Sequence, residues 1–142
     1  MNPSAKTRVL FVCIGNSCRS QMAEGFARTY GGDVMIAASA GLAPALGVAQ
    51  DTIRTMDEKN IDVRDQFPKS IQQLGRAQFD LAINMSGFGL PEDVVSPTRN
   101  WDVEDPIGED YETYCKIRDQ IEALVMDLIL ELRRAEKAGA RP

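Results

Sequence analysis

Short apolar runs alternate with segments of helical spacing along this chain, and the alternation predicts the order of its elements. Continuous apolar runs of a few residues are typical of strands that are buried on both faces of a sheet. Such runs cover residues 8–12, 34–38 and 79–83. A fourth strand is expected somewhere within residues 94–103, where the pattern is weaker.

Between these runs, apolar side chains recur every three or four residues, which predicts helices. The first helix is expected over residues 22–30, before a Gly-Gly pair, and the second begins near Val48 and ends near Asn60. Ser70 and Gln73 form a capping-box pattern, which predicts the start of a short helix. A final helix is predicted by a long apolar stripe, which consists of Tyr114, Ile117, Ile121, Leu124, Leu128 and Leu132.

The alternation of strands and helices indicates an α/β fold, with one four-stranded parallel sheet and helices on both faces. A chain of 142 residues is the size of a single domain that can bury a core. We therefore expect one domain over residues 1–142, with an ordered core over about residues 7–137. The polar tail from Arg133 onward is expected to fray.

Charge and hydropathy exclude several classes of partner. The net charge is −5, whereas sequence-independent nucleic-acid binding depends on clustered Lys and Arg. The N-terminal residues have no apolar stretch behind their charges, and the apolar run near Ala123 is interrupted by Asp127. Neither segment resembles a signal peptide or a membrane span. A cytoplasmic protein without nucleic-acid or membrane partners is expected.

The chain contains no histidine and three cysteines. Without histidine, one chain cannot form a Ser-His or Cys-His catalytic pair, or a zinc or iron site with histidine ligands. An odd number of cysteines argues against a disulfide framework. No metal and no cofactor are expected, and any nucleophile must be activated without an imidazole.

The stretch "VLFVCIGNSCRSQMAEG" places Cys13 where the first strand ends and a helix is about to begin. Gly15 and Asn16 readily accept unusual backbone angles, so this short loop can turn its N–H groups inward. The dipole of the following helix adds positive potential at the same place. The loop is therefore expected to bind an oxyanion, through Ile14, Gly15, Asn16, Ser17, Cys18 and Ser20.

Arg19 belongs to the same loop, and its planar guanidinium can hold two oxygens of a phosphate-like group. Helix N-termini and nearby cations also favour the thiolate form of a cysteine. We therefore expect Cys13 to be a nucleophile that lies directly beneath a tetrahedral oxyanion. Ser20 is expected to donate a hydrogen bond to its sulfur.

The pattern of Cys13, five residues, Arg19 and Ser20 resembles the catalytic loop of the low-molecular-weight protein tyrosine phosphatase family. This family includes arsenate reductases of the same fold. The motifs "SAG" at residues 39–41 and "WDVEDP" at residues 101–106 resemble the family in the same order. Together these motifs cover nearly the whole chain, and they imply the phosphotyrosine phosphatase I-like fold.

The resemblance also implies a reaction. In this family the Asp of the late Asp-Pro pair is the general acid, which corresponds to Asp105 here. Pro106 would fix the direction of its loop, because proline restricts its own φ angle. The implied activity is hydrolysis of phosphate monoesters, such as aryl phosphates or protein phosphotyrosine, through a cysteinyl-phosphate intermediate.

Arsenate reduction is the alternative, because arsenate and phosphate have the same charge and nearly the same shape. The segments "SCRSQMAEG" and "NWDVEDPIG" look more like the reductases. The thioredoxin-coupled reductases, however, carry two more cysteines after the third strand, and residues 84–94 contain none. A reductase would therefore need an external thiol. The positions that are usually aromatic in phosphotyrosine phosphatases are here Leu42 and Ile107, so a phenyl ring would be held less well. A third hypothesis, which we disfavour, is a module that binds an oxyanion without catalysis.

The other two cysteines have less defined roles. Cys18 either forms a reversible disulfide with Cys13 or is simply a small residue that fits the loop. Cys115 lies far from the centre of the apolar stripe of the final helix, and we expect it to be a bystander.

Overall fold

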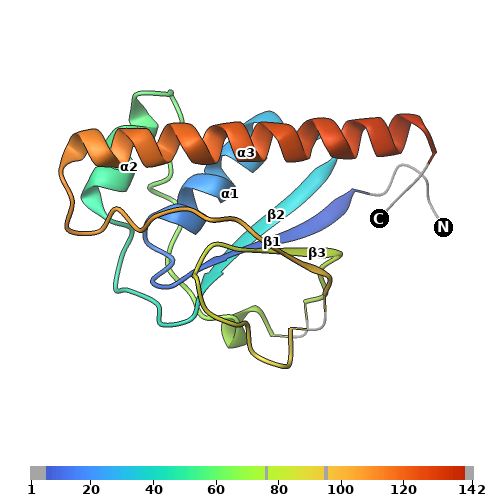
Figure 1. Cartoon of the computed structure of the whole chain (residues 1–142), viewed down its shortest axis with the longest axis horizontal. Helices are drawn as coiled ribbons and strands as arrows, with labels where there is room; N and C mark the ends of the chain where they lie inside the picture. The colour runs from blue at the N-terminus through green and yellow to red at the C-terminus, as the bar shows by residue number, and fades with distance from the viewer. Residues whose placement is uncertain (1–5, 76, 95, 140–142) are drawn as a thin grey trace.

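The structure is a computed structural model that describes residues 6–75, 77–94 and 96–139. Strands and helices alternate as the apolar pattern predicts, and α3 runs along the whole length of the molecule (Figure 1). The elements in chain order are β1 (Thr7–Cys13), α1 (Arg19–Tyr30), β2 (Met35–Gly41), α2 (Gln50–Asp57), the 3-10 helix η1 (Gln72–Leu74), β3 (Leu81–Asn84), β4 (Thr98–Asn100) and α3 (Tyr111–Lys137).

The four strands form one parallel sheet in the order β2-β1-β3-β4. Cys13, the last residue of β1, pairs with Gly41, the last residue of β2, and Val12 pairs with Asn84 at the end of β3. The carboxyl ends of the strands therefore meet at one edge, where parallel α/β sheets bind their ligands. The predicted fourth strand is β4, a short and exposed edge strand. The predicted α/β class and four-stranded parallel sheet are confirmed.

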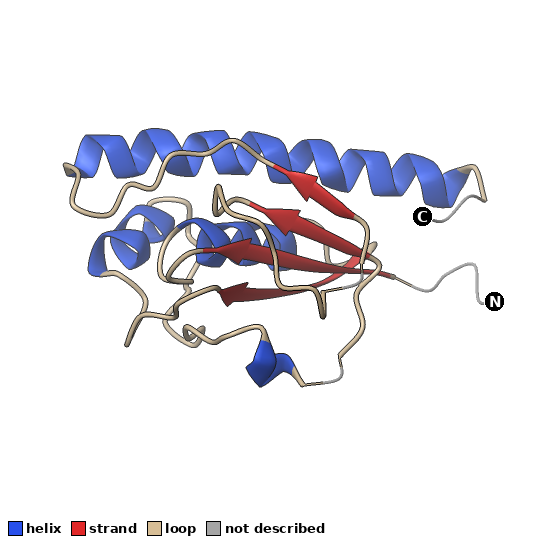
Figure 2. Ribbon diagram, turned by 60° about the horizontal axis from the view of Figure 1, so that its bottom comes forward, coloured by secondary structure: helices blue, strands red, loops and turns tan. Residues whose placement is uncertain are grey.

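Helices lie on both faces of the sheet, but one face carries all three α-helices and the other only the short η1 among the described residues. Side chains of Val9, Phe11 and Cys13 belong to the main core, which α1, α2 and α3 cover. Leu10 and Val12 point to the opposite face and form a smaller apolar cluster with Ile71. Among the described residues, that second face carries only η1 and loops, and η1 lies well apart from the three α-helices (Figure 2). The capping box at Ser70 and Gln73 forms as predicted, with hydrogen bonds of 2.7 and 3.2 Å.

The second half of α3 packs against the end of α1 and the turn that follows it. Gly31, at the end of α1, lies so close to α3 that a Cβ atom there would be 2.7 Å from Ile129 Cγ1. The expected fraying from Arg133 onward is wrong for residues 133–137, which continue α3. The reason is a tertiary anchor, because Arg133 donates hydrogen bonds to both carboxylate oxygens of Asp33 and to the Tyr30 carbonyl. No helix among the described residues is long and apolar enough to span a membrane.

Candidate active site

The loop between β1 and α1 is held open by its neighbour, residues 42–49. Asn16 adopts the left-handed conformation, with φ of 52°, and this turns the chain back toward α1. The loop carbonyls point away from the turn and accept hydrogen bonds from the neighbouring segment. These bonds are Leu42 N to Cys13 O at 3.1 Å, Ala43 N to Ile14 O at 2.8 Å, Ala45 N to Gly15 O at 2.9 Å and Ala49 N to Ser17 O at 3.1 Å.

The backbone N–H groups of the same loop have no comparable partners. Within the part of the chain that the structure describes, the N–H groups of residues 14–18 donate to no protein acceptor. The first turn of α1 follows directly, so that its positive end faces the same place. Free N–H groups around a helix N-terminus form a binding site for a tetrahedral oxyanion.

Gly41 allows β2 to approach this loop closely. A Cβ atom at Gly41 would lie 2.6 Å from the Ile14 carbonyl oxygen and 3.0 Å from both N and Cβ of Asn16. Side-chain carbons essentially never come this close to a backbone oxygen. The "SAG" motif therefore supports the loop through the absence of a side chain at its last position.

A chain of buried hydrogen bonds leads from the Cys13 sulfur into the core. Cys13 Sγ lies 2.9 Å from Ser20 Oγ. Asn16 Nδ2 donates to Ser20 Oγ at 2.7 Å and to Ser39 Oγ at 3.0 Å. Ser39 Oγ in turn donates to the carboxylate of Glu24 at 2.5 Å. All five side chains are at least nine-tenths buried, so solvent does not compete for these bonds.

The direction of the hydrogen bonds in this chain is fixed at Asn16. The backbone N–H of Lys69 donates to Asn16 Oδ1 at 3.0 Å, which identifies that atom as oxygen and leaves Nδ2 as the donor. Ser20 Oγ must therefore accept from Asn16, and its own hydrogen is left for the sulfur of Cys13. This arrangement is compatible with the predicted hydrogen bond from Ser20 to Cys13.

Arg19 is buried, and two carbonyls from distant segments hold one side of its guanidinium. Its Nη1 donates to the Met85 carbonyl at 2.5 Å and to the Val103 carbonyl at 2.9 Å. Its Nη2 lies 3.6 Å from Asp105 Oδ2. Among the described residues, Nε and Nη2 make no other hydrogen bond or ion pair, so this edge of the guanidinium can donate to a ligand.

A cavity of about 240 Å³ lies over Cys13. It brings together most of the residues predicted from the sequence. Asn16 and Ser20 do not line it, because they lie beneath the loop and act through the hydrogen-bond chain. Asp105 is at the mouth with a side chain that is 40% exposed, and its Oδ1 accepts from the Ile107 N–H. The lining residues are Cys13, Ile14, Gly15, Ser17, Cys18, Arg19, Ala45, Asp105 and Ile107, and none is aromatic.

A larger hollow of about 890 Å³ lies on the other side of Arg19, between residues 84–94 and 98–103. Arg19, the first residue of α1, is the residue that the linings of the two cavities share. No cysteine lines the larger hollow within the described residues. The smaller cavity is therefore the candidate active site, since it holds the nucleophile.

Cys18 lines the cavity but has a different environment from Cys13. Its sulfur lies 3.7 Å from the hydroxyl of Tyr114 and 3.8 Å from that of Ser17, which are long contacts. Burial raises the pKa of the Cys18 thiol, although hydrogen bonds with Thr52, Tyr114 and Ser17 partly oppose the effect. Burial also raises the pKa of Tyr114. Cys18 is therefore held as a neutral thiol.

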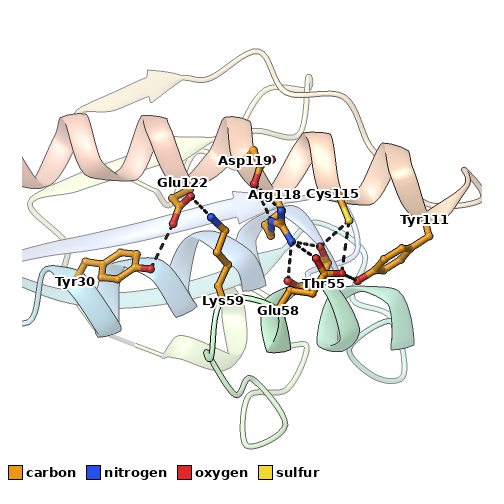
Figure 3. Close-up of polar contacts among 9 residues, drawn as sticks. All are labelled: Tyr30, Thr55, Glu58, Lys59, Tyr111, Cys115, Arg118, Asp119 and Glu122. Carbon is orange, nitrogen blue, oxygen red and sulfur yellow. Dashed lines mark hydrogen bonds and ion pairs between the residues drawn. The ribbon is translucent and has the colours of Figure 1, made fainter.

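Cys115 lies outside the cavity, in a polar cluster between α2 and α3 (Figure 3). Thr55 Oγ1 donates to its sulfur at 3.4 Å, and Glu58 lies beyond at 3.9 Å. Tyr111 donates to the same carboxylate, and burial together with this bond raises the pKa of Tyr111 to about 12. Buried Arg118 joins the cluster through Thr55 and Glu58.

Sequence reasoning missed Glu24 and Tyr114 as neighbours of the site. Glu24 follows Ser20 by one helical turn, so the i,i+4 spacing places both side chains on one side of α1. That spacing alone did not indicate that Ser39 of β2 would join them. Tyr114 was recognised only as part of the apolar stripe, and its hydroxyl reaches the loop from the other end of the chain.

Comparisons with known proteins agree with this geometry. A family model described as "Low molecular weight phosphotyrosine protein phosphatase" matches residues 8–89. The "Glutaredoxin arsenate reductase" of Synechocystis sp. is 36% identical over 129 residues, which cover 88% of this chain and 98% of that protein. The solved structure "An arsenate reductase in the phosphate binding state" is 35% identical, with a TM-score of 0.82 over 89% of this chain and 98% of its own. A low molecular weight protein tyrosine phosphatase from T. tengcongensis is 28% identical, with a TM-score of 0.74 over 89% of this chain and all of its own.

Proposed function

Since the chain belongs to the low molecular weight phosphotyrosine protein phosphatase family, we propose that it is an arsenate reductase that uses Cys13 as its nucleophile and an external thiol as its reductant. The observation that carries the proposal is the small cavity over Cys13, which offers free N–H groups and Arg19 but no aromatic side chain. Such a cavity suits a small inorganic oxyanion better than a flat phenyl ring. The similarity to arsenate reductases supports this reading over ester hydrolysis.

The first step uses the loop and three side chains. The N–H groups of residues 14–18 and the free edge of Arg19 hold the arsenate oxygens. The Cys13 thiolate, stabilised by Ser20, attacks arsenic and forms an S–As bond. One arsenate oxygen leaves as water, and Asp105 at the cavity mouth supplies a proton to it.

The second step transfers electrons. An external thiolate attacks the sulfur of Cys13, forming an S–S bond while the S–As bond breaks. The electron pair of that bond stays on arsenic, which changes from As(V) to As(III) and leaves as arsenite. A second external thiol then attacks the mixed disulfide, which returns Cys13 to its thiolate and releases an oxidised disulfide.

The need for an external thiol follows from the positions of the other cysteines. Residues 84–94, beside Arg19, contain none. Cys18 is close, but burial raises its pKa, and a neutral thiol is a poor attacking group. Cys115 is absent from the cavity and contacts Thr55 and Glu58 instead.

Phosphate-monoester hydrolysis is the second candidate. It is favoured by the fact that Cys13, Arg19 and Asp105 line one cavity, since these groups suffice for hydrolysis through a cysteinyl-phosphate without any thiol. In that reaction Asp105 would protonate the leaving oxygen and then help water attack the intermediate. Without an aromatic lining, phosphotyrosine would be held weakly.

A side-by-side steady-state assay tests the proposal. Arsenite formation is measured with glutathione plus glutaredoxin, with glutathione alone, and with thioredoxin plus its reductase, beside hydrolysis of p-nitrophenyl phosphate. We expect sustained reduction with glutathione and glutaredoxin, little with thioredoxin, and none in Cys13→Ser. If no thiol supports reduction while the aryl phosphate is hydrolysed, the protein is a phosphatase and the proposal fails.

A further inference from the structure

We infer that Cys13 and Cys18 together form a dithiol site that captures trivalent arsenic inside the active-site cavity. The inference rests on the proposed function in one respect, namely that arsenite is the product released there. The binding itself is a property of the two cysteines and can be measured without any turnover.

Both cysteines line the same small cavity. Cys13 is the last residue of β1 and Cys18 immediately precedes α1, and both line the cavity of about 240 Å³. Each residue is only 2% exposed, so a bound arsenic atom would be shielded from bulk solvent. The carbonyls of Cys13 and Ser17 accept hydrogen bonds from Leu42 N and Ala49 N, and the Cys18 carbonyl accepts from Met22 N, which anchors the loop on both sides of the cavity.

The environment of Cys18 leaves its thiol able to turn toward a ligand. Its sulfur has a hydrogen bond with Thr52 and two long contacts, 3.7 Å to the Tyr114 hydroxyl and 3.8 Å to the Ser17 hydroxyl. These contacts are weak compared with the 2.9 Å bond that Ser20 makes to Cys13. The proposed reduction uses Cys13 as the nucleophile and leaves the Cys18 thiol without a role.

The capture reaction is a substitution that involves no oxidation or reduction. Arsenite is As(OH)₃, a soft centre that favours sulfur ligands. Cys13 forms one S–As bond and Cys18 a second, while two As–O bonds break. The Cys18 thiol proton leaves with one hydroxide as water. The Cys13 thiolate brings no proton, so the hydroxide that it displaces takes one from solvent, and S–As(OH)–S and two waters result. The neutral Cys18 thiol brings the proton that its hydroxide needs.

Two-point attachment should make arsenite a strong product inhibitor. A second bond formed within one cavity raises apparent affinity by about 10²–10⁴-fold over a single attachment. Arsenite would then leave the cavity while Cys13 is joined to the external thiol in a mixed disulfide, because Cys13 cannot bind arsenic in that state. Reduction of that disulfide re-forms the dithiol, which would bind accumulated arsenite in competition with arsenate.

X-ray absorption at the arsenic edge tests the site directly in the reduced full-length protein loaded with one equivalent of arsenite. We expect two As–S bonds and one As–O bond per arsenic in the wild type. Cys18→Ser should show one As–S bond, with arsenite affinity lower by about 10²–10⁴-fold. Cys115→Ser is the matched control, and it should retain two sulfur ligands and wild-type affinity.

Other outcomes would overturn either the dithiol site or the proposed function. A single As–S bond in the wild type overturns the inference, and so does loss of a sulfur ligand in Cys115→Ser. Arsenate reduction by an enzyme with only one As–S bond leaves the proposed function standing without this site. A two-sulfur site in a protein that does not reduce arsenate overturns the proposed function and leaves the dithiol site.

Discussion

Gly41→Ala tests whether the close approach of β2 shapes the oxyanion-binding loop. The added methyl group would lie 2.6 Å from the Ile14 carbonyl and 3.0 Å from Asn16 N and Cβ. These neighbours are backbone and Cβ atoms, so no flexible side chain can move away to make room. The loop itself must shift by several tenths of an ångström, and the N–H groups of residues 14–18 shift with it.

The size of the effect follows from overpacking. Extra carbon atoms in a well-packed interior cost about 1–3 kcal/mol. A chain of this size loses about 3 °C in Tm per kcal/mol, so Gly41→Ala should lower Tm by roughly 3–9 °C. Misplacement of reacting groups by about 1 Å can cost on the order of 10²-fold in rate, so we expect a loss of about 10–100-fold in kcat/KM.

Thermal unfolding and titration with inorganic phosphate measure the two effects separately. Gly47→Ala is the matched control, because no atom lies within 4 Å of a Cβ built there. The control should leave Tm and phosphate affinity close to those of the wild type. If Gly41→Ala also keeps wild-type Tm and phosphate affinity, the loop does not depend on β2 in the way we argue.

Three further substitutions address individual side chains. Arg19→Lys should lose most of its activity, because a point charge replaces neither the fork nor both carbonyl bonds; unchanged kinetics in steady-state assays would limit Arg19 to a structural role. Asp105→Asn should slow phenyl phosphate hydrolysis by about 10²–10⁴-fold and p-nitrophenyl phosphate hydrolysis much less, and equal slowing would exclude Asp105 as the acid. Ser39→Ala should destabilise the fold by about 1–3 kcal/mol in urea unfolding, because buried Glu24 loses one of its two donors and Asn16 loses an acceptor, whereas an unchanged midpoint would show that the hydrogen-bond chain is dispensable.

Local features of the sequence were sufficient to predict the strands and the loop. The apolar run before Cys13 and the pair of Gly15 and Asn16 are contiguous, so a strand followed by a turn can be recognised without any tertiary information. Asn16 has a φ of 52°, in agreement with the expectation that it accepts an unusual backbone angle. Arg19 was predicted for the same reason, since it lies within the same short segment.

Features that depend on packing between distant segments were not predicted. The hydrogen bond from Ser39 to Glu24 joins β2 to α1, and nothing in either segment alone indicates it. Arg133 keeps the end of α3 helical through Asp33, which is 100 positions away in the chain. The number of helices on each face of the sheet was also not predicted. It depends on the face over which each strand-to-strand connection passes, and the apolar periodicity of a helix does not indicate that face.

Release of arsenite in a single turnover tests the central claim most directly. Reduced enzyme is mixed with one equivalent of arsenate in the absence of any external thiol, and arsenite is measured before and after glutathione is added. We expect no arsenite until glutathione is added, and then one equivalent, with glutathione joined to Cys13 as a mixed disulfide. One equivalent of arsenite from the thiol-free enzyme, with a disulfide between two of its own cysteines, would contradict the account.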